Sequence, residues 1–274
     1  MTVNITDKHN KSKVVRETGS AAQDPKLRAK VLGLYGLLAR WDEVREEPWL
    51  QELFSIEEEE RKRRSLERRI RNARIGSFKP MTDFEWDWPT RIDREAIDEL
   101  FALEFLEEGG NVILLGANGL GKTMIAQNLA YDAVLRGETV RFTTASEMLN
   151  DLGMPETTTS LNRRMRKYCH PRLLAIDEVG YLSYGTRHAD LLFEVVNRRH
   201  GKSTIVTTNK AFREWNEVFP NSASVVALID RLVHRAEVVL IEGESYRKKE
   251  AEERAARKAL ERGKRAGARK RKEK

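Results

Sequence analysis

Eight residues between an apolar run and a helix-forming run constrain the fold more than any other part of this sequence. Residues 116–123 read GANGLGKT, which is the spacing G-x-x-x-x-G-K-T. Glycines at these positions let backbone N–H groups turn inward around an anion without interference from a Cβ atom. The apolar run 111–115 predicts a buried strand before the loop, and residues 123–135 predict a helix after it, ended by Gly137. This order predicts a phosphate-binding loop in a parallel α/β fold.

The loop also predicts its ligand, a nucleoside triphosphate with Mg²⁺. In loops of this kind the lysine reaches the β- and γ-phosphates and the hydroxyl of the next residue holds the metal. The following helix directs its positive N-terminal end at the phosphates. We therefore expect ATP and Mg²⁺ as cofactors, with the ATP contacts made by Gly116, Asn118, Gly119, Leu120, Gly121, Lys122, Thr123 and Met124, and the metal held by Thr123.

A second apolar run, residues 172–176, ends in the two acids Asp177 and Glu178. A parallel strand buried on both faces is continuously apolar, and ligands bind beyond the carboxyl ends of such strands. We expect Asp177 to bind Mg²⁺ through its water shell and Glu178 to orient the attacking water. Acids that merely favour a helix N-terminus are the alternative, which loses weight beside the phosphate-binding loop.

Two more segments extend the same pattern. The β-branched run 203–208 predicts a strand, and Asn209 at its end is expected to contact the γ-phosphate or the attacking water, although Asn in this position is often a turn residue. Arg231 is expected to act as the arginine that a neighbouring subunit supplies to the γ-phosphate, with Arg235 in reserve. An ordinary surface arginine on a helix is the alternative.

From about residue 68 to residue 247 the chain resembles an IstB-like ATPase, the helper protein of an insertion-sequence transposase. More distant relatives are the DnaC-type helicase loaders and the DnaA initiator, all AAA+ ATPases. Asn118 and Met124 depart from the residues that the family more often has there, without removing a phosphate contact, and residues 152–160 also diverge. The resemblance is carried by residues 84–87 (FEWD), 111–116, 140–145, 174–181 (LAIDEVGY), 208–209 with Trp215, 230–232 (DRL) and 243–247 (GESYR).

This resemblance implies an AAA+ P-loop fold, an α/β three-layer sandwich with a parallel sheet, preceded by a small helical domain. It implies a homo-oligomer, either a ring or a helical filament, whose ATP sites are completed by a neighbour. It further implies slow ATP hydrolysis coupled to assembly on double-stranded DNA, and recruitment or stimulation of an IstA-like transposase. A DnaC-like helicase loader is the nearest alternative, and a P-loop kinase of small molecules is a more distant one.

Composition divides the chain into four parts. Residues 1–24 are polar and expected to be disordered, 25–78 form a helical N-terminal domain, 79–246 the ATPase domain, and 247–274 a basic tail. Gly76 and Pro80 mark the linker. The charged stretch 57–74 is interpreted as a solvated helix with i,i+4 pairs, or alternatively as a face for DNA or a partner. Three aromatic residues ahead of the first strand are expected mainly as core filler, with an adenine contact as the alternative: Phe84, Trp86 and Trp88.

Two basic regions are candidates for DNA contact. The tail 247–274 has 14 Lys/Arg and 5 Asp/Glu, whereas the whole chain has a net charge of +7. It would attract a polyanion through phosphate contacts, or it is a solvated terminus; its helix-forming first part is expected to break at Gly263 and Gly267. The second region consists of Arg163, Arg164, Arg166 and Lys167, where DnaA-like initiators carry a DNA-facing helix. Its spacing places Arg163, Arg166 and Lys167 near one helical face, as an ordinary surface helix would also do.

Several classes of protein are disfavoured. No apolar run approaches the roughly 20 residues of a membrane span, and the first residues lack the apolar core of a signal peptide. The single cysteine, Cys169, excludes an internal disulfide, and Cys169 with His170 lacks further ligands for a metal. We expect a cytoplasmic protein with no membrane partner.

Overall fold

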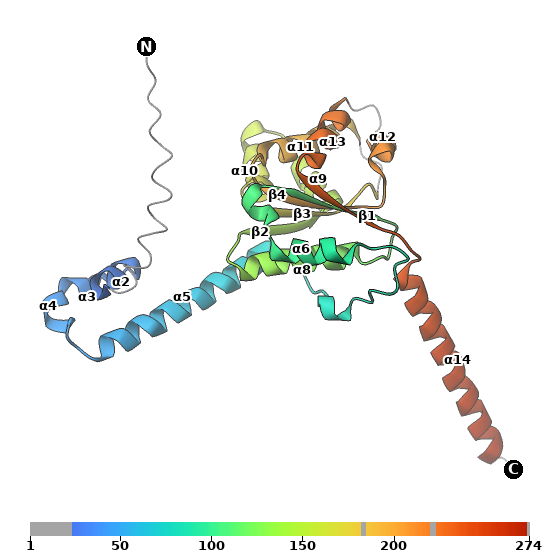
Figure 1. Ribbon diagram of the computed structural model, residues 1–274, viewed down its shortest axis with the longest axis horizontal. Coiled ribbons are helices and arrows are strands. Elements are labelled where there is room, and N and C mark those ends of the chain that lie inside the picture. Colours follow the sequence, from blue (N-terminus) through green and yellow to red (C-terminus); the bar gives the residue numbers. More distant parts are fainter. Residues whose placement is uncertain (1–23, 182–184, 220–222, 273–274) are drawn as a thin grey trace. The chain divides into compact units, whose positions relative to one another are not determined.

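The structure is a computed structural model that describes residues 24–181, 185–219 and 223–272 (Figure 1). The chain divides into two compact units between Arg68 and Arg69, inside the long helix α5 (Trp49–Ala73). We call residues 24–68 the N-terminal unit and residues 69–272 the core unit. The division lies ahead of the linker predicted at Gly76 and Pro80. The disorder predicted for residues 1–24 falls outside the described residues, except for Asp24, whose carboxylate accepts a hydrogen bond from the N–H of Lys26 at the start of α2.

The N-terminal unit is helical, as the sequence predicts. It contains α2 (Pro25–Val31), α3 (Tyr35–Ala39), α4 (Trp41–Val44) and the first part of α5. Its small core is formed by Ala29, Leu32, Leu50 and Phe54. The guanidinium of Arg28 in α2 donates to both carboxylate oxygens of Glu58 in α5, at 2.8 and 3.1 Å. This bidentate ion pair supplements a core that is too small to be stable alone.

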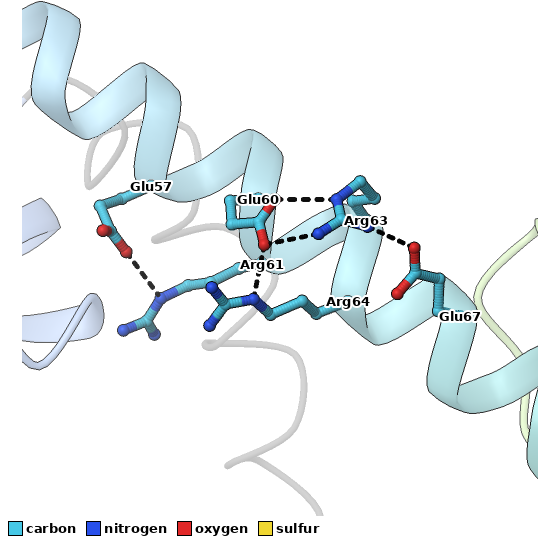
Figure 2. A network of polar contacts seen from close by, with 6 residues as sticks. All are labelled: Glu57, Glu60, Arg61, Arg63, Arg64 and Glu67. Carbon is cyan, nitrogen blue, oxygen red and sulfur yellow. Dashed lines mark hydrogen bonds and ion pairs between the residues drawn. The ribbon is translucent and has the colours of Figure 1, made fainter.

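The charged side chains of α5 form ion pairs with one another (Figure 2). Glu60 accepts hydrogen bonds from Arg63 at 2.7 Å and Arg64 at 2.6 Å, and Arg63 also contacts Glu67. The hydrogen bonds from Arg63 and Arg64 lower the pKa of Glu60 to about 2. Such exposed pairs contribute little stability each, but they satisfy the charges within one helix. The structure therefore shows the intrahelical pairing expected of a solvated helix.

The core unit is built on a parallel sheet. Its described strands are β1 (Asn111–Gly116), β2 (Val140–Thr144), β3 (Leu173–Val179), β4 (Ser203–Thr208) and β5 (Ala236–Ile241), arranged in the order β2-β3-β4-β1-β5. In the registers of β1, Ile113 lies opposite Val206 of β4 and Val238 of β5. Strands β1, β3 and β4 agree with the apolar runs predicted from the sequence, and β2 falls on the segment 140–145 that carries part of the family resemblance. The edge strand β5 is not among those predictions, and its residues Val238 and Leu240 are partly exposed.

Helices cover both faces of the sheet (Figure 1). On one face lie α6 (Arg94–Ala102) and α8 (Lys122–Leu135), and on the other α9 (Ala145–Gly153), α10 (Thr158–Cys169), α11 (Thr186–Arg198) and α13 (Ser224–Val233). Short helices connect these layers: η1 (Met81–Asp83), α7 (Phe105–Glu108), η2 (Phe212–Glu214) and α12 (Trp215–Val218). This is the three-layer α/β sandwich with a parallel sheet that the sequence predicts.

The chain ends in a long helix, α14 (Tyr246–Lys272). It continues through Gly263 and Gly267, so the predicted break at these glycines is wrong. A glycine inside a helix costs only about 1 kcal/mol relative to alanine, and the neighbouring Ala, Arg and Lys residues are strong helix formers. Along the described residues, no helix combines the length and the apolar character that a bilayer crossing requires.

A buried arginine joins the amino ends of two core strands. Arg199 is 2% exposed, and among the described residues no carboxylate pairs with it. Its guanidinium donates instead to the carbonyl oxygens of Tyr168 at 2.7 Å and Pro171 at 2.9 Å, and further to Arg172, Ser203 and the Thr204 hydroxyl. Burial lowers the pKa of Arg199 to about 10. The side chain thus satisfies backbone acceptors that would otherwise be buried without donors.

We expect Arg199→Met to destabilise the protein by about 2–4 kcal/mol, because several buried carbonyl groups lose their donor at once. Denaturant unfolding checks this value. The matched control is Arg198→Met, which removes the adjacent, 41% exposed guanidinium. It should cost less than about 1 kcal/mol. Equal losses for the two variants would contradict the role given to Arg199.

Candidate nucleotide site at the carboxyl edge of the sheet

Strands β1, β3 and β4 end at the same edge of the sheet because all three run parallel. A cavity of about 440 Å³ opens at this edge. The structure brings together there most of the residues that the sequence predicts: Asn118, Gly119, Leu120, Gly121, Lys122, Thr123, Met124, Glu178 and Asn209 line it. Gly116 ends β1 just before the loop, and Asp177 lies behind Thr123.

The loop between β1 and α8 has the backbone of an anion cradle. Gly119 and Gly121 have φ of 82° and 87°, in the region that favours glycine. Their neighbours also leave no room for a side chain. A Cβ on Gly119 would lie 2.3 Å from Oγ of Ser245, and one on Gly121 would lie 2.4 Å from Cε2 of Phe84. The loop glycines are therefore required both by the turn and by the segments packed against it.

Lys122 places a nearly buried ammonium group inside the loop. Its Nζ donates to the carbonyl oxygens of Gly116 at 2.8 Å and Ala117 at 2.7 Å. Burial lowers the pKa of Lys122, while the charge of Asp177 acts in the opposite direction. A cation held by neutral carbonyls at a helix N-terminus is a fitting site for phosphate oxygens, because an anion would supply the counter-charge.

Asp177 is held by two hydroxyl groups. The hydroxyl of Thr123 donates to its Oδ1 at 3.0 Å, and that of Thr207 donates to the same oxygen at 2.5 Å. A buried carboxylate beside the loop hydroxyl is the donor set that Mg²⁺ prefers, so Thr123 and Asp177 fit the predicted metal role. Among the residues that the structure describes, no cluster of three or more His, Cys, Asp or Glu side chains offers another metal site.

Glu178 has an unusual backbone that turns its carboxylate outward. Its φ is 62°, and the pairing of β3 with β4 shifts register between Ile176 and Val179. The Glu178 N–H donates to the Thr207 hydroxyl at 2.9 Å, which holds this conformation. A left-handed glutamate is strained by about 1–2 kcal/mol, and such strain is often found at functional sites. The side chain is exposed and lines the cavity.

Among the polar residues at the cavity that the sequence analysis does not assign to the site, Thr207 and Arg247 act on the predicted residues. Thr207 links Asp177 to the backbone of Glu178, as described above. Arg247 lines the cavity, and its charge contributes to lowering the pKa of Lys122. Arg247 belongs to the GESYR segment that carries the family resemblance, and this segment is the signal that could have identified it. Thr207 has no comparable signal, because its role arises from the register of two strands.

The far wall of the cavity is aromatic and is fastened to the loop. Phe84 and Trp88 line it and are half-buried, so the expectation that they fill the core is wrong for both. Trp88 Nε1 donates to the Glu244 carbonyl at 2.8 Å, and the Tyr246 N–H donates to the Gly119 carbonyl at 3.0 Å. Trp86 packs against Phe84 with ring centroids 4.8 Å apart. A planar base would fit between such rings and the loop.

The structure does not bring Arg231 and Arg235 to this cavity. Both line a second cavity of about 400 Å³ at the amino end of β1, where Asn111 donates to the carbonyls of Arg231 and Leu232. The guanidinium of Arg231 lies over the ring of Phe193, 5.9 Å from its centroid. The guanidinium of Arg235 donates to the Glu108 carbonyl at 3.5 Å. Either arginine could therefore serve only the site of another subunit.

The basic cluster on α10 separates into two pairs. Arg163 and Arg166 are exposed. Arg164 and Lys167 bind Asp151, with N–O distances of 2.6 and 3.1 Å. The charges of Arg164 and Lys167 are therefore partly neutralised, whereas Arg163 and Arg166 are exposed and form no ion pair with the other described residues.

The match to a known family is longer at both ends than the resemblance found in the sequence, which runs from about residue 68 to residue 247. Residues 35–254 match the family described as IstB-like ATP binding protein. The chain belongs to this family. The IstB-like match spans both units and includes the entire cavity at the carboxyl edge.

Named relatives of the IstB-like chain come from insertion sequences. It is 37% identical over 191 residues to a protein of Pseudomonas aeruginosa named as an ATP-binding protein of insertion sequence IS21, which covers 69% of this chain and 72% of the relative. It is 33% identical over 203 residues to a corresponding IS5376 protein of Geobacillus stearothermophilus, covering 74% and 81%. The crystal structure of DnaI matches at 18% identity with a TM-score of 0.49, over 61% of this chain and 89% of that one.

For the ATP hydrolysis expected from the sequence, we predict that Thr207→Val lowers the rate by about 10- to 100-fold, because Asp177 and Glu178 lose the hydroxyl that positions them. Nucleotide affinity should change little, since Thr207 is not part of the phosphate loop. A steady-state ATPase assay and titration with a fluorescent ATP analogue separate the two effects. The control is Thr82→Val, which removes an exposed hydroxyl outside the cavity lining. A Thr207→Val protein with unchanged turnover would show that the hydroxyl has no positioning role.

Proposed function

We propose that this protein is an ATP-dependent DNA-binding AAA+ regulator that assembles on target DNA in the cytoplasm and recruits or stimulates a transposase. The observation that carries the proposal is the meeting of Lys122, Thr123, Asp177 and Glu178 at one cavity, in a chain of the IstB-like ATP-binding family. Relatives named for insertion sequences favour a transposition helper over a helicase loader. The partner would be an IstA-like transposase.

Within one subunit, the residues of the cavity divide the work of binding and hydrolysis. Lys122 and the loop N–H groups would hold the phosphates, and Thr123 with Asp177 would hold Mg²⁺. Magnesium-bound ATP supplies the phosphoanhydride bond that is broken. Glu178, exposed to the cavity, would orient the attacking water, and Asn209 at the end of β4 would contact the γ-phosphate or that water.

The completed site needs a second subunit. Arg231 lies by the amino end of β1, whereas the loop lies at the carboxyl end of the same strand. One chain thus carries half of a composite site at each edge of its sheet. Joining unlike edges gives a head-to-tail interface, which closes into a ring or continues as a helical filament. ATP at this interface would act as the link between subunits.

Duplex DNA would be held through its backbone. Arg163 and Arg166 project from α10 into solvent, and α14 carries the basic C-terminal segment. Contacts of arginine and lysine with phosphates position DNA without reading its sequence. Such contacts suit a scaffold that must work at many target sites.

A mixing experiment tests the composite site. Lys122→Ala and Arg231→Ala proteins should each lack ATPase activity, because each removes one half of every site. An equimolar mixture should recover roughly a quarter of the wild-type activity, since that share of head-to-tail interfaces pairs an intact loop with an intact arginine. Activity that stays at the level of the separate variants would contradict a contribution from the neighbour. The parallel mixture with Arg235→Ala decides between the two arginines.

Glu178→Gln should leave ATP-dependent assembly intact but trap it, because binding is preserved while the water is no longer activated. Light scattering or sedimentation, with and without ATP and duplex DNA, measures the size distribution over time. Lys122→Ala should abolish nucleotide-dependent assembly. A wild-type protein that stays monomeric with saturating ATP and DNA would refute the proposed function.

A further inference from the structure

A third cavity lies beside the edge strand β2, away from the nucleotide site. Its volume is about 500 Å³, and it is formed where the end of α5 meets β2 and the helices α9 and α10. The charged and polar side chains at its wall that bear on a ligand are Arg74, Arg141, Glu147, Asp151, Lys167 and Tyr168. All of these residues belong to the core unit.

Arg141 is incompletely satisfied in this cavity. Its Nε is buried and has no hydrogen-bond partner among the described residues. Its Nη1 donates to the Asn72 carbonyl over a long distance of 3.4 Å, and its guanidinium lies 5.8 Å from the centroid of the Tyr168 ring. Burial lowers the pKa of Arg141, and the like charge of Arg74 lowers it further. A partly buried guanidinium with an unused donor is a costly arrangement unless a ligand completes it.

The nearby carboxylates do not supply the missing acceptor for Arg141. Asp151 accepts from Arg164 at 2.6 Å, Lys167 at 3.1 Å and the Tyr168 hydroxyl at 2.9 Å, so its oxygens are engaged by α10. Arg74 is exposed at the end of α5 and forms no ion pair with the other described residues. Two guanidinium groups therefore line one cavity without a carboxylate bound to either.

We propose that Arg74 and Arg141 form a binding site for a phosphate group of the DNA backbone. This inference rests on the proposed function, because it assigns one contact point of the duplex. A planar guanidinium matches phosphate oxygens in a bidentate way, and Arg141 has a free N–H in its fork. The site adjoins α10, which carries the exposed Arg163 and Arg166, so one duplex backbone running along this face would meet both.

Binding of a labelled duplex by fluorescence anisotropy, with ATP present and at several salt concentrations, tests the site. The double variant Arg74→Ala with Arg141→Met removes both charges while keeping an apolar stem at residue 141. Its affinity should fall by about tenfold at fixed salt, and the salt slope should decrease by about 1, because one phosphate contact is lost. The loss should be equal for duplexes of unrelated sequence. Arg213→Ala, which removes one exposed guanidinium from η2, is the control for loss of a surface charge outside this cavity and should bind like the wild type.

Two further variants distinguish loss of the phosphate contact from loss of folding. Arg141→Lys keeps the charge without the fork and should bind with intermediate affinity. Glu147→Gln removes the remaining carboxylate of the cavity that has no assigned partner and should tighten DNA binding, whereas a site for a cation would be weakened. ATP affinity should match the wild type in every variant, since none of these residues lines the nucleotide cavity, and this shows that the core unit is still folded.

The outcomes separate this inference from the proposed function. If the wild type fails to bind duplex DNA, both are refuted. If the wild type binds and the double variant binds equally well, the phosphate site alone is refuted. Inorganic phosphate tests whether the cavity binds a small free anion instead. That assignment would follow if phosphate raises the unfolding midpoint of the wild type but not of the double variant, while the two proteins bind DNA with equal affinity. Loss of transposase stimulation with normal DNA binding assigns it to an acidic protein surface instead.

Discussion

The ammonium group of Lys122, buried within a loop that offers it only neutral carbonyls, is the interaction on which the site depends. The loop can surround a cation in this way because its glycines bring the backbone close. A cation so placed favours an anion beside it, and the parallel sheet adds Asp177, Glu178 and Asn209 at the same edge. The strand-loop-helix segment thus forms a site in which the positive charge of Lys122 favours a bound phosphate.

Local and contiguous features were predictable from the sequence. The loop, the acid pair and three strands are each contained in a short run of residues, so residue pattern and spacing identify them. Thr207 and Arg247 were not predictable from chemistry alone, because tertiary structure brings them to the cavity. Thr207 depends on a register shift between β3 and β4, and Arg247 arrives from the start of the C-terminal helix. The helix α14 was mispredicted for a different reason. The cost of a glycine inside a helix was given too much weight at Gly263, although the neighbouring residues are strong helix formers.

The two edges of the sheet carry different chemistry. The carboxyl edge offers a cradle for an anion, and the amino edge offers Arg231 and Arg235 beside the buried Arg199. The length of the sheet separates these two groups of residues, so Arg231 and Arg235 do not line the cavity at the phosphate loop of their own chain. The N-terminal unit and the cavity next to β2 add surfaces that lie outside this arrangement.

The hydrogen bond from the Tyr246 N–H to the Gly119 carbonyl has a mechanical consequence. It fastens the first residue of the 27-residue helix α14 to the middle of the phosphate loop. At 1.5 Å per residue, that helix is about 40 Å long, so a rotation at the loop would give a larger displacement at the far end of the helix. A tilt of about 5° at the loop would displace the far end by about 3.5 Å on that length. Small rearrangements of the loop around a phosphate would thereby move the far end of α14 by a larger distance, which could change its contacts with a binding partner.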